Sequence, residues 1–270
     1  MFRAVDLRLP PNLNFIPCLV RSAVKRTYAP ALAFTILFVL TWALPAHAEL
    51  GPCKPLEKRE VLICGEGKGA AIVIPDTVSP SGRLALAWRN PDAPPTEQPD
   101  DNQDLELLVV RLADGAALSR GKTDFWDTGE MRANRLQELA TWSPDSRLLV
   151  RTFNGRFATG NVDLYAFGAD DKAAAPIDFL KIVDPLVRAR LRSRVKNADD
   201  YDFFLTGMKD PDKPVTIDNR GQIVANVMLW VPKLGPFYYY TVKAQATRSK
   251  DTLDVRILSI VYRGMEPREE

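Results

Sequence analysis

Residues 141–150 read TWSPDSRLLV, and this stretch indicates how the chain folds. Its centre, Ser143–Ser146, is a run of turn residues, because Pro fixes φ and the Ser and Asp side chains can bond to nearby backbone. Apolar residues stand on both sides, at 139–142 and at 148–150. We therefore predict two antiparallel strands joined by a tight turn.

The same order of turns and strands is predicted elsewhere in the chain. A turn, a strand, a loop, a second strand and an Asp/Gly turn follow one another twice. A weaker third copy carries the turn Asp218–Gly221, and two further apolar runs follow it at 237–246 and 252–263. The three copies begin with the turn SPSG in 79–115, with the opening stretch in 139–171, and with VTIDNRGQIVANVMLW in 215–230.

The turn at Trp142–Asp145 resembles the one in the WD40-like repeat of the periplasmic TolB family, which reads W-S-P-D-G before an apolar strand. Ser146 stands where Gly is usual. The first copy has Val78 for Trp and Ser81 for Asp, and the third has lost Ser-Pro altogether. The resemblance implies antiparallel units of the kind that form propeller blades.

The spacing of the turns argues against a full propeller. They start at 79, 143 and 218, whereas regular blades repeat every ~40–45 residues and a closed ring needs at least about four blades. We predict a mainly β or α+β fold of antiparallel β-sheet units with blade-like repeats, one or two short helices and no complete closed propeller.

One segment, DPLVRARLRSRVKN at 184–197, departs from the strand pattern. Asp184 suits an N-cap and Pro185 the first helical position, and Leu, Arg and Ala are good helix formers. Apolar or small residues alternate with arginines, however, which is typical of a strand. We favour a helix.

The N-terminus has the order of a secretory signal. Residues 1–28 hold five basic residues and one acidic residue, an apolar run follows at 29–44, and Ala46–Ala48 reads A-x-A. We expect cleavage after Ala48, with an uncleaved membrane anchor as the alternative. The prediction divides the chain into a signal peptide, 1–48, and a single periplasmic β-rich domain, 49–270, with a possible sub-boundary near 172–200.

Loss of residues 1–48 changes the formal net charge from +2 to −2, because the segment carries five positive charges and one negative charge. A nearly neutral protein gives no electrostatic reason to expect nucleic acid as a partner. Cys18 leaves with the signal, and Cys53 and Cys64 remain. We predict a disulfide between them, since the alternative of a redox pair lacks C-x-x-C spacing.

The single histidine of the chain, His47, lies inside the predicted signal. Without it, the usual Ser-His-Asp and Cys-His mechanisms and His-based metal sites are excluded. GEGKGA at 65–70 lacks the spacing of a phosphate-binding loop. The acidic stretch from Asp100 to Arg111 lacks the Gly and the Glu of a calcium loop. We expect no cofactor and no metal.

Two segments are candidates for interaction. Arg188, Arg190, Arg192 and Arg194 concentrate charge that could meet an anionic surface; the alternative is a solvated face balanced by acidic residues at 199–202. Tyr238 and Tyr240 belong to an aromatic run, 237–240, that could stack on sugars or on a partner chain. The alternative is core packing, with residues 238 and 240 on one face of a strand.

These features predict an exported bacterial cell-envelope protein that acts as a non-catalytic binding or interaction module. Its partner would be an unknown envelope protein or an anionic envelope component, with no integral membrane segment after cleavage. The alternative is a carboxylate-based hydrolase of envelope glycans. That reaction needs two carboxyl groups at a defined separation in a pocket, one with a raised pKa, and no pair stands out in the sequence.

Overall fold

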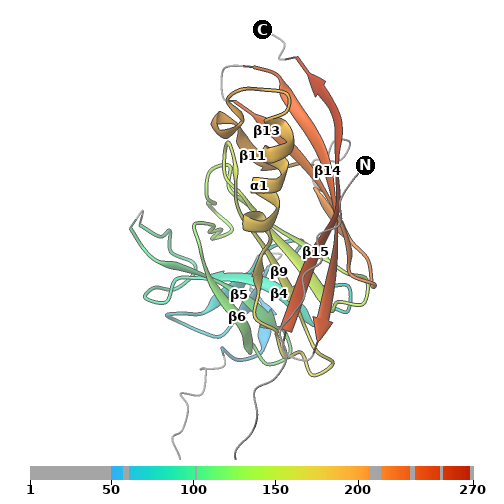
Figure 1. The fold of residues 1–270 in the computed structure, drawn as a ribbon. Helices are drawn as coiled ribbons and strands as arrows, with labels where there is room; N and C mark the ends of the chain where they lie inside the picture. The colour runs from blue at the N-terminus through green and yellow to red at the C-terminus, as the bar shows by residue number, and fades with distance from the viewer. Residues whose placement is uncertain are drawn as a thin grey trace, which may run out of the picture. The chain divides into compact units, whose positions relative to one another are not determined.

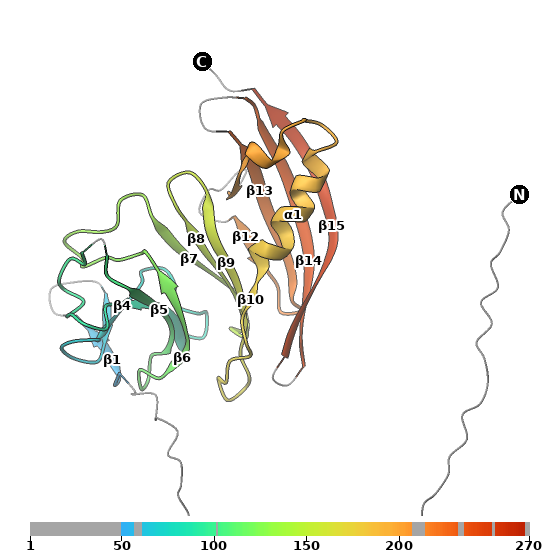
Figure 2. The same ribbon diagram turned by 60° about the vertical axis from the view of Figure 1, so that its left-hand side comes forward.

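The computed structural model describes residues 50–56, 61–100, 102–206, 214–231, 235–249 and 252–267 (Figures 1 and 2). The predicted signal peptide, 1–48, lies outside the described residues. None of the helices in these ranges combines the length and the apolar character that crossing a bilayer requires.

The described chain folds into three antiparallel sheets, which confirms the predicted fold class. Within these residues the sheets form no closed propeller. The first sheet has the order β1 (Cys53–Pro55), β2 (Leu62–Cys64), β3 (Ala71–Val73), β4 (Leu84–Arg89), β5 (Leu105–Arg111) and β6 (Ala117–Thr123). The second has the order β10 (Ile177–Asp178), β9 (Thr159–Ala166), β8 (Leu148–Asn154) and β7 (Gln137–Trp142).

The third sheet has the order β11 (Asp202–Leu205), β13 (Gln222–Trp230), β14 (Phe237–Ser249) and β15 (Thr252–Glu266). The short strand β12 (Val215–Ile217) also pairs with β13. In all three sheets the repeated turn joins two neighbouring strands: β3 to β4, β7 to β8, and β12 to β13. The third and weakest copy of the sequence pattern therefore joins two paired strands of its sheet, as the second and strongest copy does.

Strand β8 is buried along its whole length because its sheet is covered on both faces. Leu149 and Phe153 belong to a core shared with the first sheet. Leu148 and Val150 belong to a second core, shared with the third sheet and the helix. A strand covered on both sides favours consecutive apolar residues, which explains Leu148–Val150 after the opening turn.

Helix α1 (Phe179–Leu191) packs into this second core. It buries Phe179, Val183, Val187 and Leu191, which recur every fourth residue and so lie on one face. A short 3₁₀ helix, η1 (Ala198–Asp200), follows it. The core around α1 combines residues from before and after the possible sub-boundary at 172–200.

The predicted helix exists, but its predicted bounds are wrong. It begins five residues before Asp184, with Asp178 as the N-cap, whose Oδ1 accepts the Lys181 N–H at 3.0 Å. Pro185 lies inside the helix rather than at its first position. The packing of Phe179 and Val183 against the sheets extends the helix beyond the local Asp-Pro signal, and Leu191 is the last residue of the helix.

The predicted disulfide joins Cys53 to Cys64, which face each other directly across β1 and β2. Cys64 is fully buried in a small core on the outer face of the first sheet, with Ala85, Ala87 and Val110 around it. The bond therefore attaches the first strand of the described chain to this sheet.

Candidate functional site

The three repeated turns share one backbone geometry. In each of them the fourth residue has positive φ and donates its N–H to the carbonyl of the first residue. The side chain of the first residue accepts the N–H at the start of the next strand. The fourth residues are Gly82 (φ 68°), Ser146 (φ 61°) and Gly221 (φ 78°), and the first residues are Ser79, Ser143 and Asp218.

Hydrogen bonds join the turns to one another. Ser146 Oγ accepts the Ser81 N–H at 2.9 Å, which links the second turn to the first. Trp142 adds to this link, since its Nε1–H donates to the Thr77 carbonyl at 2.8 Å. Asn219 Oδ1 of the third turn accepts the Asp145 N–H at 2.8 Å. We call the segments Ser79–Gly82, Ser143–Ser146 and Asp218–Gly221 the turn row.

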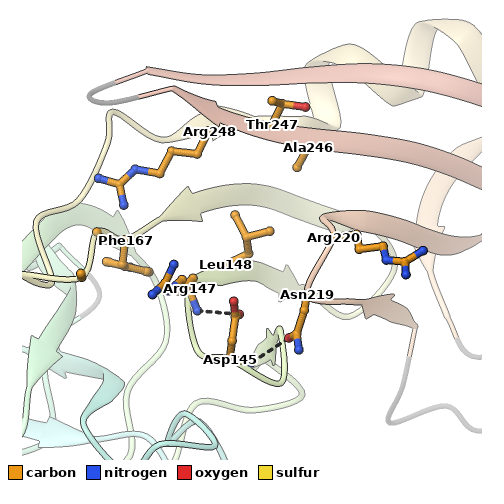
Figure 3. A pocket seen from close by; sticks show the side chains of 11 residues that line it. Asp145, Arg147, Leu148, Phe167, Asn219, Arg220, Ala246, Thr247 and Arg248 are labelled. Carbon is orange, nitrogen blue, oxygen red and sulfur yellow. Dashed lines mark hydrogen bonds between the residues drawn. The ribbon is translucent and has the colours of Figure 1, made fainter.

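A pocket of about 500 Å³ opens beside the second and third members of the turn row (Figure 3). We call it the turn pocket. Its lining includes the buried side chains of Leu148 and Phe167 together with polar residues. It is lined by Asp145, Arg147, Leu148, Phe167, Gly168, Ala169, Asn219, Arg220, Ala246, Thr247 and Arg248.

Three arginines from three separate segments line the turn pocket: Arg147 follows the second turn, Arg220 belongs to the third, and Arg248 stands near the end of β14. In Figure 3 the side chains of Arg147 and Arg248 extend to the same side, and Arg220 points the other way. Guanidinium groups bind phosphate and carboxylate oxygens through paired N–H donors.

The acidic residue of the lining, Asp145, is engaged by its own turn. Its Oδ1 accepts the Ser143 hydroxyl at 2.6 Å and the Arg147 backbone N–H at 3.2 Å. Arg248 donates to the Lys172 carbonyl at 3.3 Å. It can approach that loop because Gly168 has no side chain; a Cβ there would lie 3.1 Å from both terminal nitrogens of Arg248.

Most arginines of the predicted basic segment contact other residues of the same chain. Arg188 forms an ion pair with Asp184 at 2.6 Å and donates to the carbonyl oxygens of Ala198 and Tyr201. Its guanidinium thus holds the chain that follows α1 against the helix. A role of this side chain toward a partner stays a prediction.

The other arginines of the segment differ in their surroundings. Arg192 forms an ion pair with Asp199 at 2.7 Å. This agrees with the alternative that the arginines lie on a solvated face and are balanced by the acidic residues at 199–202. Arg194 lies over the ring of Tyr262, 3.7 Å from its centroid. Arg190 is exposed and lines a separate groove beside β15.

Tyr238 and Tyr240 lie in the core. Their exposed fractions are 9% and 1%, and they share one face of β14, as the alternation in sequence predicts. Tyr238 packs edge-on against Tyr201, with ring centroids 5.6 Å apart. Burial raises the pKa of the Tyr240 hydroxyl. The core-packing alternative thus describes these two rings, which a ligand could not reach without opening the sheet.

Two acidic side chains come together around Arg151, between the first and second sheets. Arg151 donates to both oxygens of Glu138, at 2.5 and 2.9 Å, and to Asp163 at 2.7 Å. The Thr123 hydroxyl also donates to Glu138 at 2.7 Å. Burial raises the pKa of Glu138, and the hydrogen bonds from Arg151 and Thr123 partly oppose this.

This carboxylate pair does not have the arrangement that glycoside hydrolysis needs. The Glu138 side chain is fully buried, and Arg151 holds both carboxylates. A general acid and a nucleophile or base must instead reach the substrate from a pocket. We therefore assign Glu138, Arg151 and Asp163 a structural role.

Within the described residues, no group of three or more His, Cys, Asp and Glu side chains is placed to hold a metal ion. The turn pocket itself was not predicted. Asn219 could have been found from the repeat, because it occupies the third turn. Arg248 carries no sequence signal, since only the packing of the third sheet against the second brings it beside Arg147.

No protein-family model matches the chain, and a comparison with curated proteins finds no match either.

Proposed function

We propose that the protein is an exported, periplasmic protein of the bacterial cell envelope, that it acts as a non-catalytic binding module, and that its turn pocket takes an anionic envelope component. The observation that carries the proposal is that one pocket is lined by Arg147, Arg220 and Arg248, with the side chains of Arg147 and Arg248 extending to the same side. The three residues are distant in sequence, and the fold brings them together.

The dimensions and chemistry of the turn pocket support this function. Its volume, about 500 Å³, lies within the range of small-molecule sites. A lining that combines apolar side chains with a few polar groups can hold a sugar-sized group and orient its charge. The hydrogen bonds along the turn row give the pocket a defined shape, which lowers the entropic cost of binding.

Two features support the cellular setting. The Cys53–Cys64 disulfide is of the kind that persists in an oxidising compartment. The three equivalent turns, each between two antiparallel strands, are what a distant relationship to WD40-like envelope repeats would produce. That relationship is part of the proposal.

Binding to lipopolysaccharide tests the proposal, with chemically dephosphorylated lipopolysaccharide, which keeps only its carboxylates, as the less anionic comparison. Arg147→Glu should weaken binding of the phosphorylated form about tenfold or more, because it replaces an attractive charge with a repulsive one at the pocket. Arg190→Glu is the matched control, since this arginine is exposed on α1, away from the turn pocket. Isothermal titration calorimetry measures both variants.

Three results would overturn the proposal. One is equal affinity for the two forms of the ligand, and another is loss of binding in Arg190→Glu with Arg147→Glu unaffected. The latter would assign the ligand to the basic segment of α1. The third is release of soluble sugar fragments from purified envelope glycan by the wild-type protein, which would show the hydrolase instead.

A further inference from the structure

The outer edge of β15 has the features of an interaction surface. At 15 residues β15 is the longest strand of the described chain, and within the described residues no strand pairs with its outer edge (Figure 2). A strand edge exposes unpaired N–H and C=O groups, and a long exposed edge readily adds a further strand. The first six residues of β15, Thr252–Ile257, pair regularly with β14.

Exposed apolar side chains lie on β15 and on the helix beside it. Seven large hydrophobic side chains are exposed among the described residues, and four of them lie on β15 and on the neighbouring helix. These are Leu186, Leu258, Val261 and Met265. A groove of about 490 Å³ runs between the two elements. We call it the α1–β15 groove; its lining is Leu186, Ala189, Arg190, Ile257, Leu258, Ser259 and Ile260.

Helix α1 has a second apolar stripe that its own chain leaves open. The buried stripe runs from Phe179 to Leu191 at intervals of four residues. Leu186 and Ala189, one helical turn apart, form the second stripe, and both are exposed in the α1–β15 groove. An additional strand along β15 would pair the free backbone groups and would reach the groove at Ile257.

The charged residues of β15 suit one particular occupant. Asp254 and Arg256 are both exposed on the face of β15 that points away from the core, and neither has an ion-pair partner among the described residues. Leu253, Val255 and Ile257 alternate with them on the core face. The strand therefore carries one acid and one base placed symmetrically about Val255.

We propose that the occupant is a second copy of this chain, and that two β15 strands pair antiparallel about a two-fold axis at Val255. In this register Asp254 of each copy faces Arg256 of the other, so the ion pair forms twice. Leu253 faces Ile257 on the core side, next to Leu186. Opposite charges and apolar pairs directly across an antiparallel ladder stabilise it.

The irregularities of β15 limit the contact to this region. Register shifts against β14 leave Leu258 and Arg263 with no opposite residue. Such bulges bend a strand and stop regular pairing. The two-fold contact uses the regular stretch before the first bulge, and both copies contribute the same surface, so the pair is closed.

Sedimentation velocity of the purified protein over a dilution series tests the dimer, with circular dichroism to show that each variant is folded. The wild type should sediment as a dimer that dissociates on dilution. Asp254→Arg and Arg256→Asp should each weaken the dimer about tenfold or more, because every substitution acts twice across the two-fold axis. The double variant with both changes should restore it, since the two charges are exchanged.

Lys243→Glu is the matched control. Lys243 is exposed on the same sheet face, but it lies on β14, one strand away from the edge, and it should leave the dimer unchanged. A wild-type protein that stays monomeric at the highest concentration would overturn the proposal and leave the edge to a different partner. A dimer that both single variants leave intact would also overturn it, as would a double variant as weak as either single one.

Discussion

The hydroxyl of Ser146 accepts the backbone N–H of Ser81 at 2.9 Å and thereby joins the second repeated turn to the first. Ser146 has φ 61°, a conformation that glycine adopts at the equivalent places, Gly82 and Gly221. A non-glycine residue there costs about 1–2 kcal/mol. The hydrogen bond to Ser81 offsets this cost and explains why serine can stand where the other two turns have glycine.

Two substitutions separate these effects. Ser146→Ala should lower the free energy of unfolding by about 1 kcal/mol, because it keeps the unfavourable φ and removes the hydrogen bond. Ser146→Gly should stay within about 0.5 kcal/mol of the wild type, because relief of the strained φ balances the lost bond. Urea unfolding with equal slopes measures both. An alanine variant as stable as the wild type would show that the bond contributes nothing.

The turns were predictable because their signals are local. Ser143–Ser146 needs only its own side chains to form, and the apolar strands on either side must lie in a sheet to be buried. The third copy, Asp218–Gly221, has the same turn geometry with a different sequence. The side chain of Asp218 accepts the N–H at the start of the next strand, as the side chain of Ser143 does in the second copy.

The features that could not be predicted from the sequence depend on contacts between segments that are distant in the chain. Strand β6, ALSRGKT, is mostly polar and lies at an edge of the first sheet. Its sequence therefore has no apolar alternation from which a strand could be predicted. Helix α1 extends to Phe179 because of a core that the sequence around Asp184 does not reveal. The turn pocket was missed for the same reason, because Arg147 and Arg248 meet only in the folded chain.

The disulfide has a measurable effect on stability. Cys53→Ser together with Cys64→Ser should lower the free energy of unfolding by about 3 kcal/mol, the chain-entropy value for a loop of this size. The wild type in reductant should show the same loss, and the double variant should not respond to reductant. Peptide mapping without reduction should recover the linked pair. Two alkylatable thiols in freshly isolated protein would contradict the bond.

The cap of α1 gives a dependence on pH. Burial alone would raise the pKa of Asp178, but hydrogen bonds from the Lys181 N–H and ammonium outweigh it and lower the pKa. A depressed pKa means that the stabilisation is present above the unfolded value, near 3.9, and is lost as pH falls through the folded value.

Asp178→Ala should therefore cost about 1 kcal/mol at pH 7, a normal value for an N-cap, and less at pH 3. Asp178→Asn is the matched control, because it keeps an acceptor for the Lys181 N–H without a titratable group. Thermal unfolding at several pH values measures the difference. A cost that does not change with pH would show that the carboxylate charge plays no part.

Export can be tested on the protein recovered from the envelope fraction. We expect its N-terminus to be Glu49, because A-x-A directly precedes this residue. N-terminal sequencing and intact mass measure this. Replacing Ala46 and Ala48 with lysine should block cleavage and leave the longer chain. A wild-type chain that retains residues 30–48 would support the membrane anchor.

The buried pair of Glu138 and Arg151 predicts the largest loss of stability. Arg151→Met removes the cation and leaves Glu138 buried, with the Thr123 hydroxyl as its one donor among the described side chains. Removing one partner of a buried ion pair typically costs about 3–5 kcal/mol. Glu138→Gln should cost less, because Arg151 keeps Asp163 at 2.7 Å.

The loss in Arg151→Met should depend on pH. Burial already raises the pKa of Glu138 above its unfolded value, near 4.3, and removal of the cation raises it further. A raised pKa means that the folded state binds the proton more tightly, so stability falls as pH rises from about 4.3 through the folded pKa. The deficit relative to the wild type should thus be small near pH 4 and approach its full size near pH 7. Denaturant unfolding across this range measures it, and the same substitution in a Glu138→Gln background should give a deficit that does not vary with pH. An equal deficit at pH 4 and pH 7 in Arg151→Met itself would show that lost packing, rather than the buried charge of Glu138, causes the instability.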